Sequence, residues 1–238
     1  MAVFEFNDEN YLREYFKFRK SADYFWWVRR LPIRGNVLEV GSGPGQLSEE
    51  LTDCKYTGFD IAPGSIRLAK KLYPSKKFVC GDAHALTSYF EKDGFDWVIT
   101  VDVLEHADNP MKIVEQMVRV ARPGGKILIK APNQPNMYFF LKSGKNPFRW
   151  RDYVMTKPDK FKWGSESDHK WMTSGIAFRN ELLKLGCEIH VYDDWFLPVH
   201  RTRLIKDVLL KASKYVFKPI FPHLGYNFII IAQKPLKG

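Results

Sequence analysis

Three glycines spaced two residues apart, Gly41, Gly43 and Gly45, form the strongest candidate for a ligand-binding loop in this chain. They follow the apolar run 36–40, which is typical of a strand, and precede a stretch from Gln46 that favours a helix. Glycine permits positive φ and lets the backbone approach a bound molecule closely. Loops of this kind serve several cofactors, so the loop alone does not identify the ligand.

Two carboxylates and the glycine spacing narrow the choice of ligand. The G-x-G-x-G spacing differs from the G-x-G-x-x-G of dinucleotide folds. Glu39 lies two residues before Gly41, and an acid pointing into the loop would repel a pyrophosphate but suit a cation. Asp60 ends the second predicted strand, 17 residues after Gly43, where a carboxylate can accept both ribose hydroxyls and Ile61 can pack on an adenine. A ligand with an adenosine, a positive centre and no phosphates fits this set.

Histidines are the candidates for a proton acceptor. His106 follows the fourth predicted strand, at the carboxyl edge where open α/β sheets bind ligands. An imidazole with a reference pKa of about 6.5 can remove a proton near neutral pH. His169 ends a long insertion and could line the acceptor pocket, although a structural role is the alternative for both residues. The sequence has no Ser-His-Asp arrangement and no metal-ligand spacing of His, Cys and acids, so no metal site is expected.

Alternating strand and helix patterns must position these residues. Pro110 fits the first turn of a helix, and the pair Gly124-Gly125 is expected to end that helix. The expected strands are 36–40, 55–60, 76–82, 95–103, 126–132, 188–195 and 224–234. The expected helices are one or two within 7–30, then 46–51, 63–74, 109–125, 172–187 and 201–221.

This alternation predicts a single α/β domain with a parallel sheet and right-handed crossovers. A chain of 238 residues fits one domain and can bury its core without disulfides or metal. We expect a helical cover over residues 1–35, a cofactor-binding core over 36–132 and the end of the sheet in 171–238. Residues 133–170 between them form a long irregular insertion, which is usually functional and is expected on the acceptor side.

Basic charge concentrates late in the chain. The formal net charge is +10, yet the first 140 residues are close to neutral, whereas residues 201–238 hold eight bases and one acid. Such an excess near aromatics suggests phosphate, an anionic membrane or nucleic acid as partner, with simple solvation as the alternative. The basic amphipathic helix 201–221 could lie on an anionic bilayer or simply cover the sheet. RNA is the weaker option, because nothing resembles a dedicated RNA-binding module.

Composition excludes several protein classes. Hydrophobic residues make up 45% and charged residues 27%, which excludes disordered and collagen-like chains. No apolar run of about 18 residues predicts a transmembrane helix, and the acidic first residues do not resemble a signal peptide. The three cysteines are far apart, which argues for a reducing compartment. We therefore expect a cytoplasmic protein, and peripheral contact with a membrane surface is left open as an alternative.

Taken in order, the motifs resemble those of the class I S-adenosylmethionine-dependent methyltransferases. The matching segments are VLEVGSGPGQ (37–46), Asp60, CGDAHAL (80–86), FDWVITVDVLEHADNP (95–110) and ARPGGKILIKAPN (121–133). VLEHADNP looks most like the quinone-biosynthesis and related small-molecule subgroup, in which the pattern WWVRR (26–30) also recurs. The resemblance implies a Rossmann-like, doubly wound sheet of seven strands, mostly parallel with the last strand antiparallel, and helices on both faces.

The same resemblance implies contacts with S-adenosylmethionine by position. Glu39 and the glycine-loop backbone would meet the methionyl portion, Asp60 would bind the ribose, and Ile61 would border the adenine. Asp82 would accept from the adenine amino group, with Ala83 contributing backbone. The alternatives are structural: a helix cap at Asp60, a turn acid at Asp82 and a paired carboxylate at Glu39.

Further contacts implied by the resemblance concern the methionyl end. Val101, at the end of the fourth strand, would line it, unless this residue is plain core. Family members often use an N-terminal arginine for the methionyl carboxylate, and Arg19, Arg29 and Arg30 are the candidates here.

The activity implied is transfer of a methyl group to a small-molecule or lipid-linked acceptor, with S-adenosylhomocysteine as product. Orientation can supply much of the acceleration, and a base such as His106 is needed only if the acceptor loses a proton. Aromatic residues of the cover and the insertion could form the acceptor pocket or merely pack the lid. The alternatives are a methyltransferase of RNA or protein and a cofactor-binding protein without turnover. A nicotinamide-dependent oxidoreductase is disfavoured by the glycine spacing and Glu39.

Overall fold

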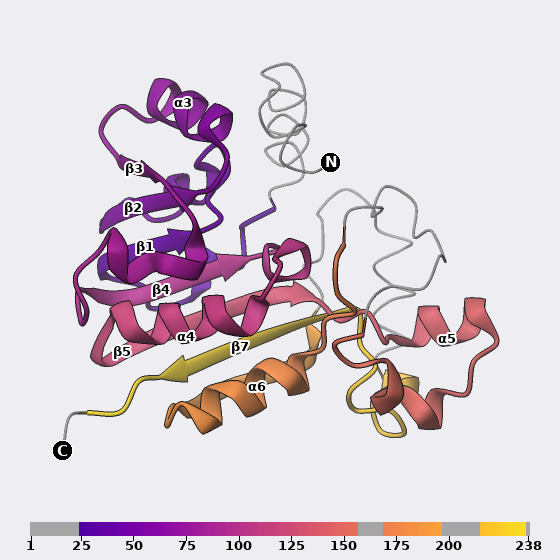
Figure 1. Ribbon diagram of the computed structural model, residues 1–238. Helices are drawn as coiled ribbons and strands as arrows, with labels where there is room; N and C mark the ends of the chain where they lie inside the picture. Colours follow the sequence, from indigo (N-terminus) through magenta and orange to yellow (C-terminus); the bar gives the residue numbers. More distant parts are fainter. Residues whose placement is uncertain (1–23, 157–168, 197–214, 237–238) are drawn as a thin grey trace.

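The computed structural model describes residues 24–156, 169–196 and 215–236. Within these residues seven strands form one sheet in the order β3-β2-β1-β4-β5-β7-β6 (Figure 1). Pairs among β1 to β5 are parallel, and β7 is antiparallel to both its neighbours. The expected mixed sheet is confirmed. The strands are β1 (Gly35–Val40), β2 (Cys54–Asp60), β3 (Lys77–Cys80), β4 (Phe95–Val101), β5 (Ala121–Pro132), β6 (Glu188–Phe196) and β7 (Asn227–Gln233).

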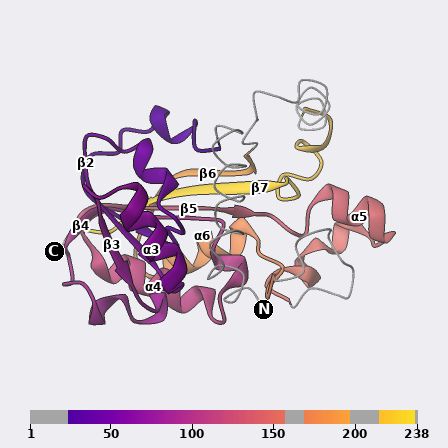
Figure 2. The same cartoon turned by 90° about the horizontal axis from the view of Figure 1, so that it is seen from above.

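Helices cover both faces of the sheet. The α-helices are α3 (Pro63–Leu72), α4 (Pro110–Val120), α5 (Met137–Ser143) and α6 (Gly175–Lys184). Short 3-10 helices are η1 (Val28–Arg30), η2 (Gln46–Glu49), η3 (Ala83–Ser88), η4 (Leu104–His106) and η5 (Pro147–Tyr153). Seen from above, α5 lies beyond the ends of β5 and β7, on the far side from α3 (Figure 2). None of the helices in the described residues has the length and hydropathy needed to cross a bilayer.

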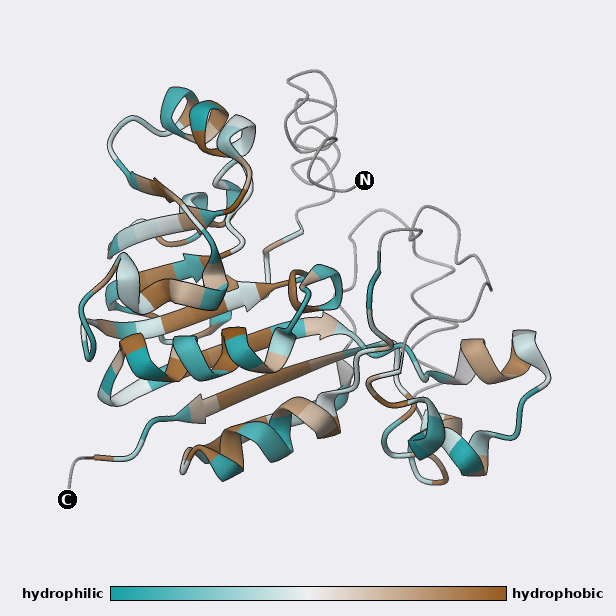
Figure 3. Ribbon diagram, viewed as in Figure 1, coloured by the Kyte–Doolittle hydropathy of each residue, from teal (hydrophilic) through white to brown (hydrophobic). Residues whose placement is uncertain are grey.

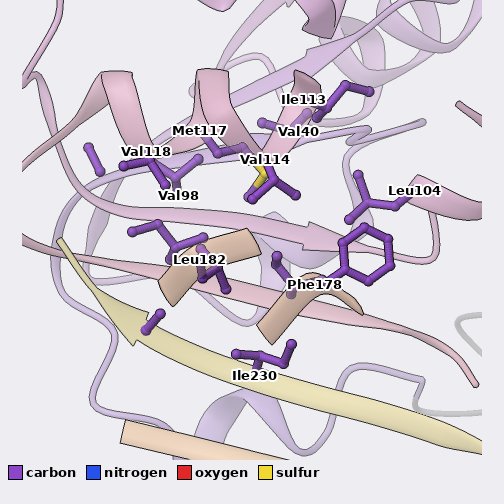
Figure 4. Close-up of a cluster of buried hydrophobic side chains, with 14 of the residues drawn as sticks. Val40, Val98, Leu104, Ile113, Val114, Met117, Val118, Phe178, Leu182 and Ile230 are labelled. Atoms are coloured by element: carbon purple, nitrogen blue, oxygen red, sulfur yellow. The ribbon is translucent and has the colours of Figure 1, made fainter. Parts of the chain in front are cut away.

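The alternation of side chains along each strand divides the core into two layers. On β4, Val98 packs in one layer, whereas Trp97 and Ile99 pack in the other. The first layer includes α4 and α6 and is drawn in Figure 4. The second layer includes η2, α3 and residues 25–33. Figure 3 shows hydrophobic strands at the centre of the sheet, which is consistent with burial on both faces.

The end of α4 differs from the expected one. The helix ends at Val120, and Gly124-Gly125 lies in β5 instead of closing the helix. Ala121 already has extended backbone angles and pairs with Phe95 of β4. The residue before a proline is restricted to extended angles, so Pro123 keeps the chain from continuing the helix. Gly124 then has a φ of +72°, and its N–H donates to the carbonyl of Lys234 at 3.0 Å.

Other differences concern short or late segments. Residues 46–51, expected as a helix, form only the 3-10 helix η2. The insertion 133–170 is less irregular than expected, since it contains α5 and η5. Most of the expected helix 201–221 and of the expected helices in 7–30 lie outside the described residues, which include only residues 215–221 of the former and 24–30 of the latter.

Candidate functional site

A cavity of about 570 Å³ opens at the carboxyl ends of the central strands. The glycine loop, the ends of β2 and β4, η3, η4 and part of β5 line it. It lies where the chain returns from β3 to place β4 beside β1, the position at which open α/β sheets bind ligands. Its volume is within the range of about 300–1,000 Å³ usual for small-molecule sites.

The glycine loop is held tightly against the sheet. The N–H groups of Gly41 and Ser42 both donate to the carbonyl of Phe59, at 2.7 and 3.0 Å. A side chain at Gly41 would bring its Cβ to 2.2 Å from a methyl group of Val103. Gly43 has a φ of +50°, and a Cβ there would meet no atom within 4 Å. At Gly43 the bare backbone therefore faces the open cavity.

Asp60 is fixed at the end of β2 and lines the cavity. Its Oδ2 accepts from the N–H of Gly43 at 2.8 Å, and its Oδ1 accepts from the N–H of Ala62 at 2.8 Å. Burial raises the pKa of the Asp60 carboxyl, and these N–H donors act in the opposite direction. Each carboxylate oxygen has capacity for a second donor. The next residue, Ile61, also lines the cavity and is 55% exposed, so it offers an apolar face for a ring.

Asp82 and Ala83, which follow the neighbouring strand β3, also line the cavity. Asp82 Oδ1 accepts from the backbone N–H of His84 at 2.9 Å and contacts His84 Nδ1 at 2.6 Å. The N–H hydrogen bond, together with the imidazole, holds the pKa of the Asp82 carboxyl below its usual range. Asp82 thus caps η3, and its contact with an adenine amino group stays a prediction.

Of the remaining predicted cofactor residues, only Val101 is in the cavity lining. Gly45 of the loop is not in the cavity lining, and an added Cβ there would come within 2.7 Å of Phe78. Glu39 is buried, and its carboxylate accepts from the hydroxyl of Tyr56. Burial and the Glu39 charge raise the pKa of Tyr56 well above its usual value. The structural pairing considered for Glu39 is therefore present, and its contact with a methionyl group stays a prediction.

The described N-terminal arginines point to partners outside the cavity. Arg29 pairs with Glu50, and the guanidinium of Arg30 lies 4.5 Å from the ring centroid of Trp26. Arg19 lies outside the described residues. The cavity lining includes instead a lysine that sequence reasoning did not select, Lys130 of β5.

Lys130 belongs to a buried charged cluster at the base of the cavity. Its Nζ donates to Asp102 Oδ1 at 2.6 Å and to the hydroxyl of Tyr24 at 3.0 Å, and that hydroxyl donates to Asp102 Oδ2. Burial acts to lower the pKa of Lys130, but the charges and hydrogen bonds of Asp102 and Tyr24 together outweigh it and raise this pKa above its usual value. Asp102 has a φ of +53°, a conformation rare outside glycine. The cluster joins β4, β5 and the N-terminal cover at the cavity.

Glu105, His106 and His169 form a second cluster in the cavity lining. His106 Nε2 lies 3.8 Å from Glu105 Oε1, and the His106 and His169 rings are 4.7 Å apart between centroids. Glu105 is 1% exposed, and its Oε2 has no hydrogen-bond partner among the described residues. Burial, followed by the Asp102 charge, raises the pKa of Glu105 to about 7. This cluster therefore contains a carboxyl group, that of Glu105, which can exchange a proton near neutral pH.

The returning segment 169–171 brings His169 to this position. The N–H groups of Lys170 and Trp171 donate to the carbonyl of Glu105 at 2.8 and 3.3 Å. The Trp171 indole donates to the carbonyl of Ala107 at 2.9 Å, and Lys170 pairs with Asp108 at 2.5 Å. His169 Nδ1 contacts the side-chain amide of Gln134. The expectation that His169 lies beside the pocket is consistent with these contacts.

The same three side chains could also hold a metal ion. One ligand atom each from Glu105, His106 and His169 lies within 4.8 Å of the others. Sequence spacing could not indicate this group, because His169 is far from the other two in the chain. The expectation that the protein uses no metal stays a prediction.

Comparisons with known proteins agree with this geometry. Residues 38–129 match the family described as "Methyltransferase domain". The chain is 31% identical to the demethylmenaquinone methyltransferase of Renibacterium salmoninarum over 123 residues, which is 50% of this chain and 48% of that one. It is 35% identical to the phthiotriol/phenolphthiotriol dimycocerosates methyltransferase of Mycobacterium leprae over 97 residues, 38% of this chain and 35% of that one. The matched segments thus span about half of the first relative and about a third of the second.

A solved structure extends the similarity to nearly the whole chain. The S-adenosylmethionine-dependent methyltransferase of Thermotoga maritima, described as a possible histamine N-methyltransferase, superposes with a TM-score of 0.64. That superposition covers 98% of this chain and 99% of the other at 15% identity, so it shows a shared fold. The glycine loop and Asp60, which line one cavity, lie within residues 38–129, so this segment is a methyltransferase domain and supports the predicted resemblance to the class I S-adenosylmethionine-dependent methyltransferases.

Proposed function

We propose that the protein transfers a methyl group from S-adenosylmethionine to a small-molecule or lipid-linked acceptor. The observation that carries the proposal is Asp60, whose two oxygens are fixed by backbone N–H groups at the cavity beside the bare backbone of Gly43. These residues fit a nucleoside: Asp60 would hold the ribose hydroxyls, Ile61 the adenine, and Val101 with the loop the methionyl side. Glu39 would meet the methionyl portion, and Asp82 with the backbone of Ala83 would contact the adenine amino group.

When bound, S-adenosylmethionine supplies a methyl group already activated by a sulfonium charge. The protein then needs mainly to orient the acceptor and exclude water. Glu105, His106 and His169 are the groups at which a proton from the acceptor would be taken up, with His106 as the proposed base. An acceptor that has no proton to lose would not need them.

The lipid-linked option for the acceptor is supported by the relatives, whose names refer to demethylmenaquinone and to phthiotriol dimycocerosates. An RNA or protein acceptor lacks comparable support. Cys54, Cys80 and Cys187 are free thiols, which supports a cytoplasmic location as part of this proposal.

Thermal unfolding with two ligands tests the cofactor. S-adenosylhomocysteine at 100 times its dissociation constant should add about 2.7 kcal/mol to the free energy of unfolding and raise the melting temperature. NADH at equal concentration should leave it unchanged, because no dinucleotide glycine spacing is present. A rise with NADH alone would overturn the proposal. Binding without transfer to any acceptor in a panel would favour a protein without turnover.

Replacing His106 tests the acceptor-side base. His106→Ala should lower kcat by about 100-fold or more while leaving S-adenosylhomocysteine binding near wild type, because general bases typically contribute 10²–10⁴-fold. Turnover with the best acceptor and calorimetric binding would be measured in parallel, with the exposed His190→Ala as control. Wild-type turnover in His106→Ala would reduce His106 to a structural role. If chelator abolished turnover and a divalent cation restored it, His106 would be a metal ligand.

A further inference from the structure

The acceptor-side lobe is a small unit outside the sheet, made of α5, η5 and residues 215–224. It has an apolar centre of its own, formed by Phe139, Phe140, Trp150, Met172 and Leu224. The ring of Phe148 in η5 lies 5.2 Å from that of Phe221, which joins η5 to residues 215–224. Figures 1 and 2 show α5 set apart from the sheet, beyond the ends of its central strands. Among the described side chains of the insertion, Phe139, Phe140, Trp150 and Tyr153 therefore pack within this lobe.

The surface of this lobe is unusually apolar. Six large hydrophobic residues among the described ones are more than 60% exposed, and five of them are in the lobe. These five are Leu141 (68%), Phe148 (73%), Tyr215 (83%), Val216 (61%) and Ile220 (61%). Single exposed apolar residues are ordinary, but a concentration of them marks an interaction site.

The lobe is also cationic. Its described segments, 137–156 and 215–224, contain five lysines and arginines and one acid, Asp152. Arg149 and Arg151 are exposed, and Arg149 pairs with Asp152. Lys145 Nζ lies 4.7 Å from the ring centroid of Tyr153, and the guanidinium of Arg151 lies 4.7 Å from that of Trp150. Long cationic side chains can cover apolar surface with their stems while their charged ends stay in water, and they are favoured at membrane interfaces.

The lobe adjoins the cavity through the chain between β5 and β7. The N–H of Asn133 donates to the carbonyl of Tyr226 at 2.8 Å, and its side-chain amide donates to the carbonyl of His223 at 2.7 Å. Pro132 and Asn227, the neighbours of Asn133 and Tyr226, line the cavity. A surface that engages the lobe is therefore held close to the cavity.

We propose that the acceptor-side lobe binds the surface of an anionic lipid bilayer. The exposed apolar side chains would enter the headgroup boundary while the lysines and arginines contact anionic headgroups. The charge excess favours a membrane over a second copy of this chain, because two cationic lobes would repel one another. This inference does not depend on methyl transfer, since lipid binding is measured without cofactor or acceptor.

Vesicle sedimentation tests the proposal with the full chain. The protein should bind phosphatidylcholine vesicles that contain about a third phosphatidylglycerol, and bind pure phosphatidylcholine at least about tenfold more weakly. Leu141→Ser with Phe148→Ser and Ile220→Ser should weaken binding by at least about tenfold. Arg149→Gln and Arg151→Gln should each weaken it by about fivefold, with a smaller effect at high salt.

Matched variants elsewhere separate this surface from general loss of apolar area or charge. Leu72→Ser with Leu183→Ser and Leu236→Ser removes exposed leucines outside the lobe, and Arg67→Gln with Lys70→Gln removes exposed cations of α3. Both should leave vesicle binding unchanged, and melting curves would confirm that every variant is folded. Equal binding by the lobe variants and the wild type would overturn the proposal. So would a wild-type dimer that the lobe variants convert to monomer without any vesicle binding, because the lobe would then join two copies.

Discussion

Asp60→Ala is expected to abolish the thermal stabilisation of this protein by S-adenosylhomocysteine. Hydrogen bonds to a charged acceptor contribute about 1.5–3 kcal/mol each, so losing two from a ribose should weaken binding by at least about 100-fold. The substitution also removes the acceptor of the Gly43 and Ala62 N–H groups, which fixes the loop. Both effects lower affinity, and the second also lowers the melting temperature without ligand.

The ligand-induced shift, and not the melting temperature itself, is therefore the quantity to compare. Titration calorimetry with S-adenosylhomocysteine would give the ratio of dissociation constants directly. Asp60→Asn keeps one carbonyl oxygen as an acceptor, so its dissociation constant for S-adenosylhomocysteine should lie between those of the wild type and Asp60→Ala. Asp53→Ala is the control, because this exposed carboxylate lies just before the opposite end of β2. If Asp60→Ala bound S-adenosylhomocysteine as tightly as Asp53→Ala does, the ribose assignment would be wrong.

The parts of the fold that follow from local patterns could be predicted from the sequence. Strand β4 is a nearly continuous apolar run because it is buried on both faces, and its position was predicted to within two residues. The glycine loop and Asp60 were identifiable because each is adjacent to a strand end that periodicity predicts. Parallel order then brings these strand ends to one edge, where the cavity lies.

Features that depend on distant contacts could not be predicted. The helix that begins at Gln46 is a short 3-10 helix that ends at Glu49, and its residues Gln46, Leu47 and Ser48 are buried against the rest of the fold. In the sequence Lys130 is a polar residue within an apolar strand, and only the structure shows that its ammonium group donates to Asp102 and Tyr24. Likewise His169 meets Glu105 and His106 through backbone contacts of the returning segment. A polar residue inside a predicted strand, as at Lys130, was nevertheless a usable signal of a buried polar partner.

Lys130→Met is expected to lower the free energy of unfolding by about 3–5 kcal/mol, because it leaves the Asp102 carboxylate largely buried without its cation. Methionine fills a similar volume, so packing loss should be small. Asp102→Asn should lower the free energy of unfolding by less than Lys130→Met does. Asparagine tolerates the positive φ of this position, and its side-chain oxygen can still accept a hydrogen bond from Lys130. Urea unfolding followed by fluorescence would measure each change.

The double variant Lys130→Met with Asp102→Asn tests whether the unpaired Asp102 charge causes the stability loss of Lys130→Met. Removing both charges leaves no buried ion to desolvate, so the double variant should be more stable than Lys130→Met alone, by about 1–3 kcal/mol. Lys126→Met on the same strand is the control, since Lys126 is only half-buried and lies over the Trp97 ring. Its substitution should cost less than about 1 kcal/mol. If Lys130→Met cost no more than Lys126→Met, the pair at the base of the cavity would be solvated, and Lys130 would be able to leave Asp102 for an anionic group of a ligand.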